Sequence, residues 1–136
     1  MLITRLKLNY FGRFHDKEIT LKPGINLIYG DNEAGKSTIH AFIRGMLFGI
    51  EKTRGRSAKP DIYSRYLPWD YPGAYGGSMD IRLADKDYRL TRSFLASDKS
   101  FSITDLSTGR EVKLKEGLLS ELIPGLTESN YRKTIS

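Results

Sequence analysis

The sequence has no cysteine, only two histidines and one tryptophan in 136 residues, and no long apolar run. Without cysteine, a disulfide scaffold and a thiolate zinc site are both excluded. His15 and His40 lie too far apart to be a ligand pair by spacing. No segment approaches the roughly 20 apolar residues that a membrane helix needs, and residues 1–10 lack the apolar core of a signal peptide. We therefore expect a soluble, cytoplasmic protein with no membrane partner.

The composition is that of one globular domain. With 39% hydrophobic residues, the chain can build a single core but is too short for two comfortable domains. The net charge of +6 and the pI near 9.5 favour polyanionic partners, although many ordinary domains are equally basic.

The first 50 residues predict strands followed by a helix. In residues 2–8 the side chains alternate between two faces of a predicted strand, with Leu2, Leu6 and Leu8 on one face and Ile3, Arg5 and Lys7 on the other. Residues 17–21 are predicted to be the second strand of a hairpin with it. The run "INLIY" at 25–29 predicts a central strand covered on both faces. From Gly35 a helical stripe begins, and Gly49 is expected to end that helix, with His40 and Arg44 on its polar face. The apolar positions of the stripe are Ile39, Phe42, Ile43, Met46, Leu47 and Ile50.

The remainder divides into three parts. Residues 51–77 are rich in Gly, Pro, Lys, Arg and Tyr without a sustained period, which predicts a loop or insertion. Residues 78–114 predict an antiparallel meander with turns at Asp85–Lys86 and at residues 107–109. Residues 115–136 predict a helical segment that is interrupted by Pro124–Gly125 and resumes after an N-cap at Thr127.

Residues 30–37, "GDNEAGKS", fit the phosphate-loop pattern G-x-x-x-x-G-K-[ST] between an apolar strand and an amphipathic helix. Such a loop directs backbone N–H groups at phosphate oxygens, and the helix N-terminus adds partial positive charge. Lys36 would reach the β- and γ-phosphates of ATP, the Ser37 hydroxyl would bind Mg²⁺, and Thr38 would contact the α-phosphate. The nucleotide-binding residues are thus Gly30, Asn32, Glu33, Ala34, Gly35, Lys36, Ser37 and Thr38. The plainer alternative is a Gly-rich turn with a solvated lysine.

A second motif is missing. ATP hydrolysis at such a site needs an aspartate at the end of a buried strand to hold the metal, and usually a glutamate to activate water. Asp85 and Asp105 follow runs that contain polar residues, so both are read as turn residues and no catalytic residue is assigned. The chain therefore reads as the N-terminal portion of a longer ATPase.

The stretch "LKLNYFGRFHDKEITLKPGINLIYGDNEAGKST" resembles the N-terminal lobe of SMC-like ABC ATPases, the group that contains SbcC and RecN. "FIRGMLFG" and "LPWDYPGAYGGSMDI" look most like the bacterial YhaN-like AAA family ATPases. The resemblance implies an α/β P-loop NTPase lobe with a mixed central sheet and an antiparallel β subdomain. It also implies a C-terminal lobe across a coiled coil, carrying the signature and the metal-binding carboxylate, and a second ATPase head in an ATP-dependent homodimer.

Several further residues have two possible interpretations. The resemblance suggests Arg13 as a phosphate contact, displaced by about one position, and Glu33 could touch a second subunit. The basic cluster Lys52, Arg54, Arg56 and Lys59 could follow a DNA backbone or be a solvated loop. Tyr63, Tyr66, Trp69, Tyr71 and Tyr75 could stack on a base or pack the loop onto the domain, and His15 could lie near the nucleotide base or at the surface.

The function expected is that of an ATP-binding lobe of a DNA-repair or DNA-maintenance ATPase, inactive in hydrolysis by itself. Double-stranded DNA and a nuclease are candidate partners. Two rivals remain: a small P-loop kinase of a metabolite, which needs βα repeats that the sequence does not show, and a basic nucleic-acid-binding module with a non-catalytic P-loop.

Overall fold

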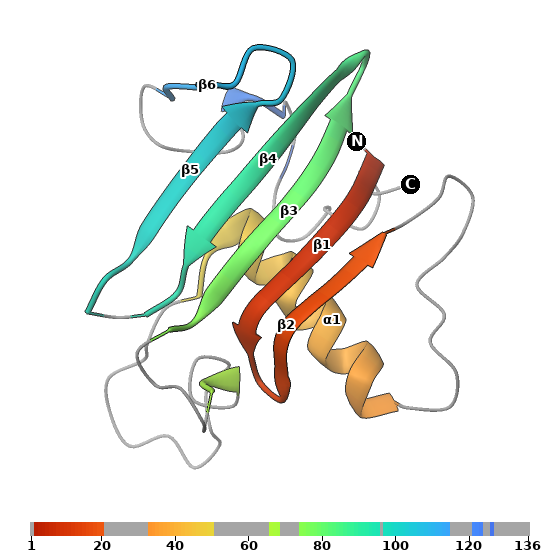
Figure 1. The fold of residues 1–136 in the computed structure, drawn as a ribbon, viewed down its shortest axis with the longest axis vertical. Coiled ribbons are helices and arrows are strands. Elements are labelled where there is room, and N and C mark those ends of the chain that lie inside the picture. Colours follow the sequence, from red (N-terminus) through yellow and green to blue (C-terminus); the bar gives the residue numbers. More distant parts are fainter. Residues whose placement is uncertain are drawn as a thin grey trace.

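The computed structural model describes residues 2–20, 33–50, 66–68, 74–95, 97–114, 121–123 and 126, with only the backbone described for 33–36. These residues form one six-stranded sheet and one long helix (Figure 1). The elements are β1 (Leu2–Phe11), β2 (Phe14–Thr20), α1 (Glu33–Phe48), β3 (Gly76–Leu83), β4 (Lys86–Ser93), β5 (Ser100–Asp105) and β6 (Arg110–Glu111). Within this described part, no helix is both long and apolar enough to cross a bilayer.

The sheet has the order β2-β1-β3-β4-β5-β6, and each neighbouring pair is antiparallel. The predicted N-terminal hairpin and the predicted meander are therefore parts of one continuous sheet, because β1 pairs with β2 on one edge and with β3 on the other. The run at 25–29 lies outside the described residues, so the mixed central sheet stays a prediction.

Two irregularities in β1 change which side chains face inward. The register with β3 shifts between Ile3 and Arg5 and again between Leu8 and Tyr10. Each shift inserts one extra residue and reverses the alternation. Ile3 was predicted to share the exposed face with Arg5 and Lys7, and this prediction is wrong: Ile3 is 5% exposed. The buried side chains of β1 are Ile3, Leu6, Leu8 and Phe11.

Helix α1 crosses one face of the sheet behind β1, β3 and β4 (Figure 1). All six apolar positions of the predicted stripe are buried, whereas His40 and Arg44 are exposed, so the helical prediction is confirmed. The helix starts at Glu33, two residues before the predicted start, as expected from the good helix propensity of Glu and Ala. It ends before Gly49, whose φ of +82° suits a C-terminal glycine.

An aromatic cluster fills the end of the core nearest the β1–β2 turn. Phe11 contacts Phe42 edge to face at 5.2 Å and stacks on Tyr66 at 5.0 Å, and Tyr75 meets Phe94 at 5.4 Å, all between ring centroids. Such pairs add about 0.5–1.5 kcal/mol each beyond the burial of area. The cluster therefore packs α1 against both halves of the sheet.

The turns differ in detail from the predictions. The β3–β4 turn is Ala84–Asp85, with Lys86 already in β4 opposite Leu83, so the predicted turn at Asp85–Lys86 was one residue late. Ala84 has φ of +52°, a left-handed conformation that is uncommon for alanine and was not predicted from the sequence. The turn at residues 107–109 is confirmed. The predicted helices after 115 lie almost wholly outside the described residues.

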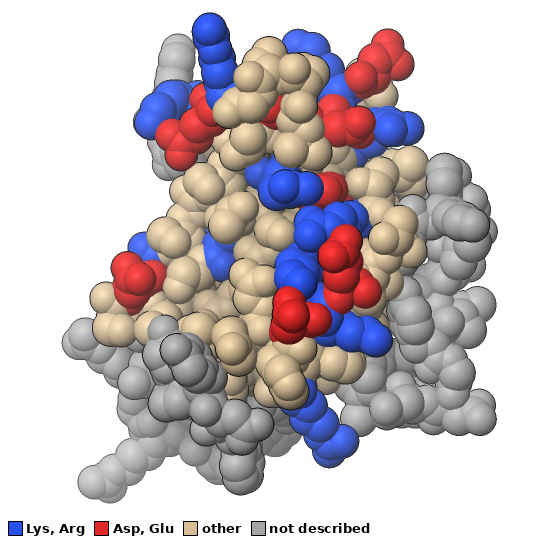
Figure 2. Space-filling view, in the orientation of Figure 1, with Lys and Arg blue, Asp and Glu red and all other residues tan. Residues whose placement is uncertain are grey.

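The face of the sheet opposite α1 carries paired charges. Asp80 is 7% exposed and accepts two hydrogen bonds from Arg89, at 2.8 and 3.1 Å. Arg5 bonds Glu18 at 2.8 Å and lies 3.7 Å from Asp80. Figure 2 shows basic and acidic side chains interleaved on this face. The positive net charge therefore does not gather into one basic patch there.

Candidate nucleotide site

The second half of the phosphate-loop motif is the first turn of α1. The backbone of residues 33–36 is helical, Ser37 is exposed and Thr38 is half-buried. The first four N–H groups of an α-helix have no intrahelical acceptor, and here they belong to Glu33, Ala34, Gly35 and Lys36. These groups are available to an anion, with the helix dipole in support. Gly30 and Asn32 lie outside the described residues.

The β1–β2 turn lies beside this start of the helix. Gly12 has φ of +59°, and a Cβ built there would lie 3.3 Å from Tyr66 Cδ1 and 3.6 Å from Thr38 Cγ2. The Gly12 N–H donates to the Tyr66 carbonyl at 2.7 Å, which fixes the turn against the segment that contains Tyr66. A site residue of the helix and a turn 26 positions earlier in the chain are thus brought together.

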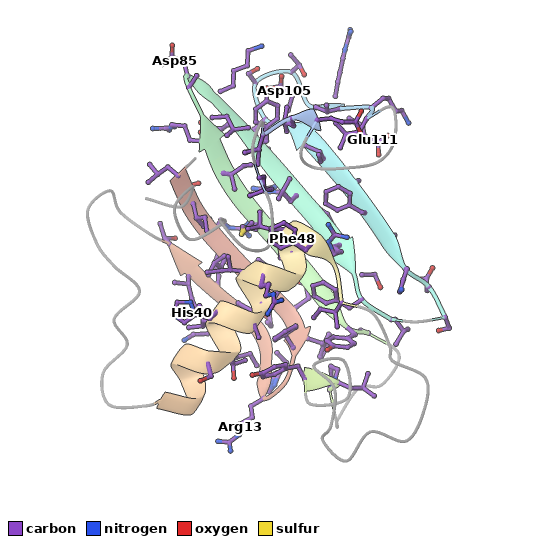
Figure 3. The ribbon with its side chains drawn as sticks, turned by 180° about the vertical axis from the view of Figure 1, so that it is seen from behind. Arg13, His40, Phe48, Asp85, Asp105 and Glu111 are labelled. Carbon is purple, nitrogen blue, oxygen red and sulfur yellow. The ribbon has the colours of Figure 1, made fainter. Side chains whose placement is uncertain are left out.

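Arg13 occupies the tip of that turn. Its side chain is exposed and points away from the body of the protein at the end of α1 that holds the motif (Figure 3). His15, by contrast, is exposed and stacks on Tyr10 with 6.4 Å between centroids, so the surface interpretation of this histidine is confirmed.

Two of the five predicted aromatics belong to the core. Tyr66 is 9% exposed and Tyr75 is 2% exposed, and both pack on Phe11. Packing of the segment onto the domain is therefore confirmed for these two tyrosines, and neither ring face is open to stack on a base. Tyr63, Trp69 and Tyr71 lie outside the described residues, as does the basic cluster at 52–59.

The two aspartates considered for metal binding lie far from the motif. Asp85 and Asp105 sit at the opposite end of the sheet from Arg13 (Figure 3). Asp105 accepts hydrogen bonds from the Ser107 hydroxyl at 2.7 Å and its N–H at 2.9 Å, and these bonds hold its pKa below the ordinary value. Both aspartates are turn residues or flank a turn, as predicted. Among the described residues, no cluster of three His, Cys, Asp or Glu could hold a metal.

The sequence interpretation overlooked Arg92, which lies at the other end of α1. Its Nε donates to the Met46 carbonyl at 3.1 Å, and its guanidinium carbon lies 4.0 Å from the centroid of the Phe101 ring. Burial lowers the pKa of Arg92 to about 10, so it stays charged at neutral pH. The inward position of Arg92 could have been predicted from the two-residue period of β4, because Tyr88, Leu90 and Phe94 are buried and position 92 falls on the same face of the strand.

Comparisons with known proteins identify the family of this chain. Residues 5–131 match the model of a family described as an AAA domain. The chain is 32% identical over 111 residues to a DNA double-strand break repair Rad50 ATPase of Thermoplasma volcanium, covering 82% of this chain and 11% of that protein. It is 27% identical over 135 residues to an uncharacterised protein YhaN of Bacillus subtilis, covering 98% of this chain and 13% of that protein.

A shorter match involves a third kind of protein. Over 56 residues the chain is 43% identical to the DNA replication and repair protein RecF of Stenotrophomonas maltophilia, covering 41% of this chain and 15% of that protein. The chain thus spans only a small share of the length of each relative. The observed helix on an antiparallel sheet fits an ATPase fold. The chain belongs to the AAA domain family, and its sequence is that of the N-terminal region of an SMC-like ABC ATPase.

Proposed function

We propose that this chain is the ATP-binding N-terminal lobe of an SMC-like ATPase and that residues 30–38 with Mg²⁺ hold the triphosphate. The observation that carries the proposal is the position of the motif: G-x-x-x-x-G-K-S runs into the first turn of a helix that is anchored on a sheet. A rigid helix holds its N-terminal N–H groups in place before the ligand arrives, which lowers the ordering cost of binding.

Each residue has a distinct role in this proposal. The N–H groups from Asn32 to Thr38 surround the phosphates, and the Lys36 ammonium neutralises the β- and γ-phosphates. The Ser37 hydroxyl supplies one oxygen ligand to Mg²⁺, for which an exposed hydroxyl at the helix start is suitable. Arg13 approaches the same phosphates from the β1–β2 turn, with Gly12 next to Thr38 setting the distance.

Hydrolysis requires groups from elsewhere in the protein. No group of three His, Cys, Asp or Glu among the described residues could hold a metal, so we propose that a C-terminal lobe supplies the metal-binding aspartate and the glutamate that activates water. Two heads would then enclose two ATP molecules. The names of the Rad50 and RecF relatives support a role in DNA repair or maintenance, with double-stranded DNA and a nuclease as candidate partners.

The test is an ATP–Mg²⁺ titration of the chain and two lysine variants by calorimetry. Lys36→Ala should weaken binding at least about tenfold, equivalent to about 1.4 kcal/mol, because one charge on the phosphates is lost. Lys86→Ala is the matched control, since Lys86 is exposed at the far end of the sheet. Equal affinity of Lys36→Ala and the unchanged chain would refute the site.

The same titration tests one rival, and a phosphoryl-transfer assay tests the other. A basic nucleic-acid-binding module with a non-catalytic P-loop would bind DNA and give no heat with ATP. A metabolite kinase would transfer the γ-phosphate to a small acceptor without another lobe. All strand pairs in the described part are antiparallel, whereas a kinase of this class needs parallel βα repeats, so this rival has the weaker support.

A further inference from the structure

A small pocket lies at the end of α1 opposite the phosphate-loop motif. It has a volume of about 250 Å³ and lies between the end of α1, β4 and the start of β5. Phe48, which lines the pocket, marks this end of the helix in Figure 3, and Arg13 lies at the other end. We call it the Arg92 pocket. The residues that line it include Phe48, Gly49, Arg92, Phe94, Lys99 and Phe101.

The lining combines aromatic walls with positive charge. Phe48, Phe94 and Phe101 supply the apolar surface, while Arg92 and Lys99 are the two charged residues. No aspartate or glutamate is among the described residues that line it. A cavity whose described lining has cations and rings but no carboxylates is complementary to a group that joins an anion to an apolar body.

Arg92 is held in a fixed position but is only partly satisfied. Its Nε donates to the Met46 carbonyl and its guanidinium carbon lies over the Phe101 ring, so the guanidinium cannot turn out into water without losing both contacts. Within the described residues it has no ion-pair partner. The partial negative charge at the C-terminus of α1 compensates only about half a charge. A partly buried cation of this kind gains most from a directly bonded anion.

The size of the pocket indicates what kind of ligand fits. A cavity of about 250 Å³ is smaller than the roughly 300–1,000 Å³ typical of small-molecule sites, but it can hold one anchoring side chain of a protein partner. We propose that the Arg92 pocket docks an acidic segment of a protein partner, with a carboxylate on Arg92 and a neighbouring apolar side chain against Phe48 and Phe101. The proposal is independent of nucleotide binding.

The probe is an acetylated, amidated peptide Gly-Glu-Phe-Glu-Gly, titrated into the isotope-labelled chain without nucleotide and followed by NMR. The expected result is saturable shifts of the Gly49 and Phe101 amides and of the Arg92 Nε–H. The neutral peptide Gly-Gln-Phe-Gln-Gly should bind at least about fivefold more weakly, because it lacks the charge-assisted hydrogen bonds. Equal binding of the two peptides, or shifts that map outside the pocket, would overturn the proposal.

Matched charge reversals avoid any damage to the contacts of Arg92. Lys99→Glu places a negative charge at the pocket and should weaken the acidic peptide roughly tenfold. Lys113→Glu makes the same change at an exposed lysine outside this lining and should leave the affinity within about twofold. Similar losses in both variants would mean that the peptide senses only net charge, which contradicts a specific pocket.

A third probe distinguishes a carboxylate on a protein partner from a small free carboxylic acid. Free 3-phenylpropionate carries the same acid and ring without a peptide backbone. It should bind more weakly than the acidic peptide, because a docking segment adds contacts outside the pocket. If it binds as tightly or more tightly, the pocket is a small-acid site and the assignment to a protein partner is wrong.

Discussion

Gly77 and Gly109 differ in why glycine is favoured: close packing of the backbone at Gly77 and a left-handed backbone conformation at Gly109. A Cβ at Gly77 would lie 2.0 Å from the Lys7 carbonyl oxygen and 2.9 Å from Phe42, so only glycine lets β1 and β3 approach at this point. Gly109 has φ of +73° but faces open space. We expect Gly77→Ala to lower the free energy of unfolding by about 3 kcal/mol or more, because backbone must move. Gly109→Ala should cost only about 1 kcal/mol, from the left-handed backbone.

Chemical denaturation of the two variants measures the difference directly. Because each change adds a single methyl group, helix propensity and side-chain entropy do not distinguish them. Equal losses in the two variants would show that the packing of β1 against β3 is looser at Gly77 than the structure places it.

Arg13 provides a prediction about the nucleotide rather than the fold. Because its side chain is exposed on a turn fixed by Gly12, Arg13→Ala should leave the melting temperature unchanged and weaken ATP binding about threefold to tenfold. Lys17→Ala removes a charge from an exposed position further along β2 and is the control. Fluorescence titration with an ATP analogue measures both variants. A loss of affinity shared by both would indicate general electrostatic attraction instead of a phosphate contact.

At the scale of elements, ion pairs across the β1–β2 hairpin make its stability depend on pH. Hydrogen bonds from Lys7 and Arg5 lower the pKa values of Asp16 and Glu18 below their ordinary values of 3.8 and 4.5. A carboxyl group whose pKa is lower in the folded state stabilises the fold above its unfolded pKa, and this stabilisation is lost as the pH falls through the folded pKa. We therefore expect the free energy of unfolding to fall as the pH drops below about 4.5.

Two variants and added salt test the origin of this dependence. Glu18→Gln should make the decrease below pH 4.5 shallower, whereas Asp98→Asn should not, because Asp98 has no ion pair within the described residues. At about 1 M salt the Debye length falls to roughly 3 Å, and the difference between the variants should shrink. An acid response that is the same in Glu18→Gln and the unchanged chain would assign it to other carboxylates.

The elements predictable from sequence are those whose signal is local. The predicted stripe was correct at its five positions within α1, because a 3.6-residue period depends only on neighbours along the chain, and its sixth position, Ile50, is buried just after the helix ends. The inward turn of Ile3 could not be predicted, because it follows from a register shift against β3, more than 70 residues away. The joining of the N-terminal hairpin and the meander into one sheet also depends on this long-range pairing of β1 with β3.

The candidate site shows the same division. Ser37 and Thr38 were predicted as site residues from the motif alone, because glycine and lysine at this spacing are typical of a phosphate-binding loop. The closeness of Gly12 to Thr38 required the fold. Arg92 was detectable as a cation on the inward face of β4, but its bond to Met46 depends on where α1 ends.

At the scale of the whole molecule, α1 connects two places with different chemistry. Its N-terminal end carries the phosphate-loop motif, and its C-terminal end meets Arg92. Between them the helix packs on β1, β3 and β4 through five buried apolar side chains. Since one rigid element spans this distance, a ligand that orders the start of α1 stabilises the whole packed unit and not only the loop.

This argument predicts the thermal response to ATP. With ATP–Mg²⁺ at about 100 times its dissociation constant, the stability should rise by about 2.7 kcal/mol, which for a chain of this length corresponds to about 10 °C in melting temperature. The rise should fall to about half or less in Lys36→Ala, where binding is at least about tenfold weaker, and persist in full in Lys86→Ala, because only the first variant loses a charge at the phosphates. Calorimetric scans with and without nucleotide measure the shift. If ATP bound with the same affinity yet left the melting temperature unchanged, the unfolded chain would have to bind it equally well, and a site built by the folded start of α1 would be ruled out.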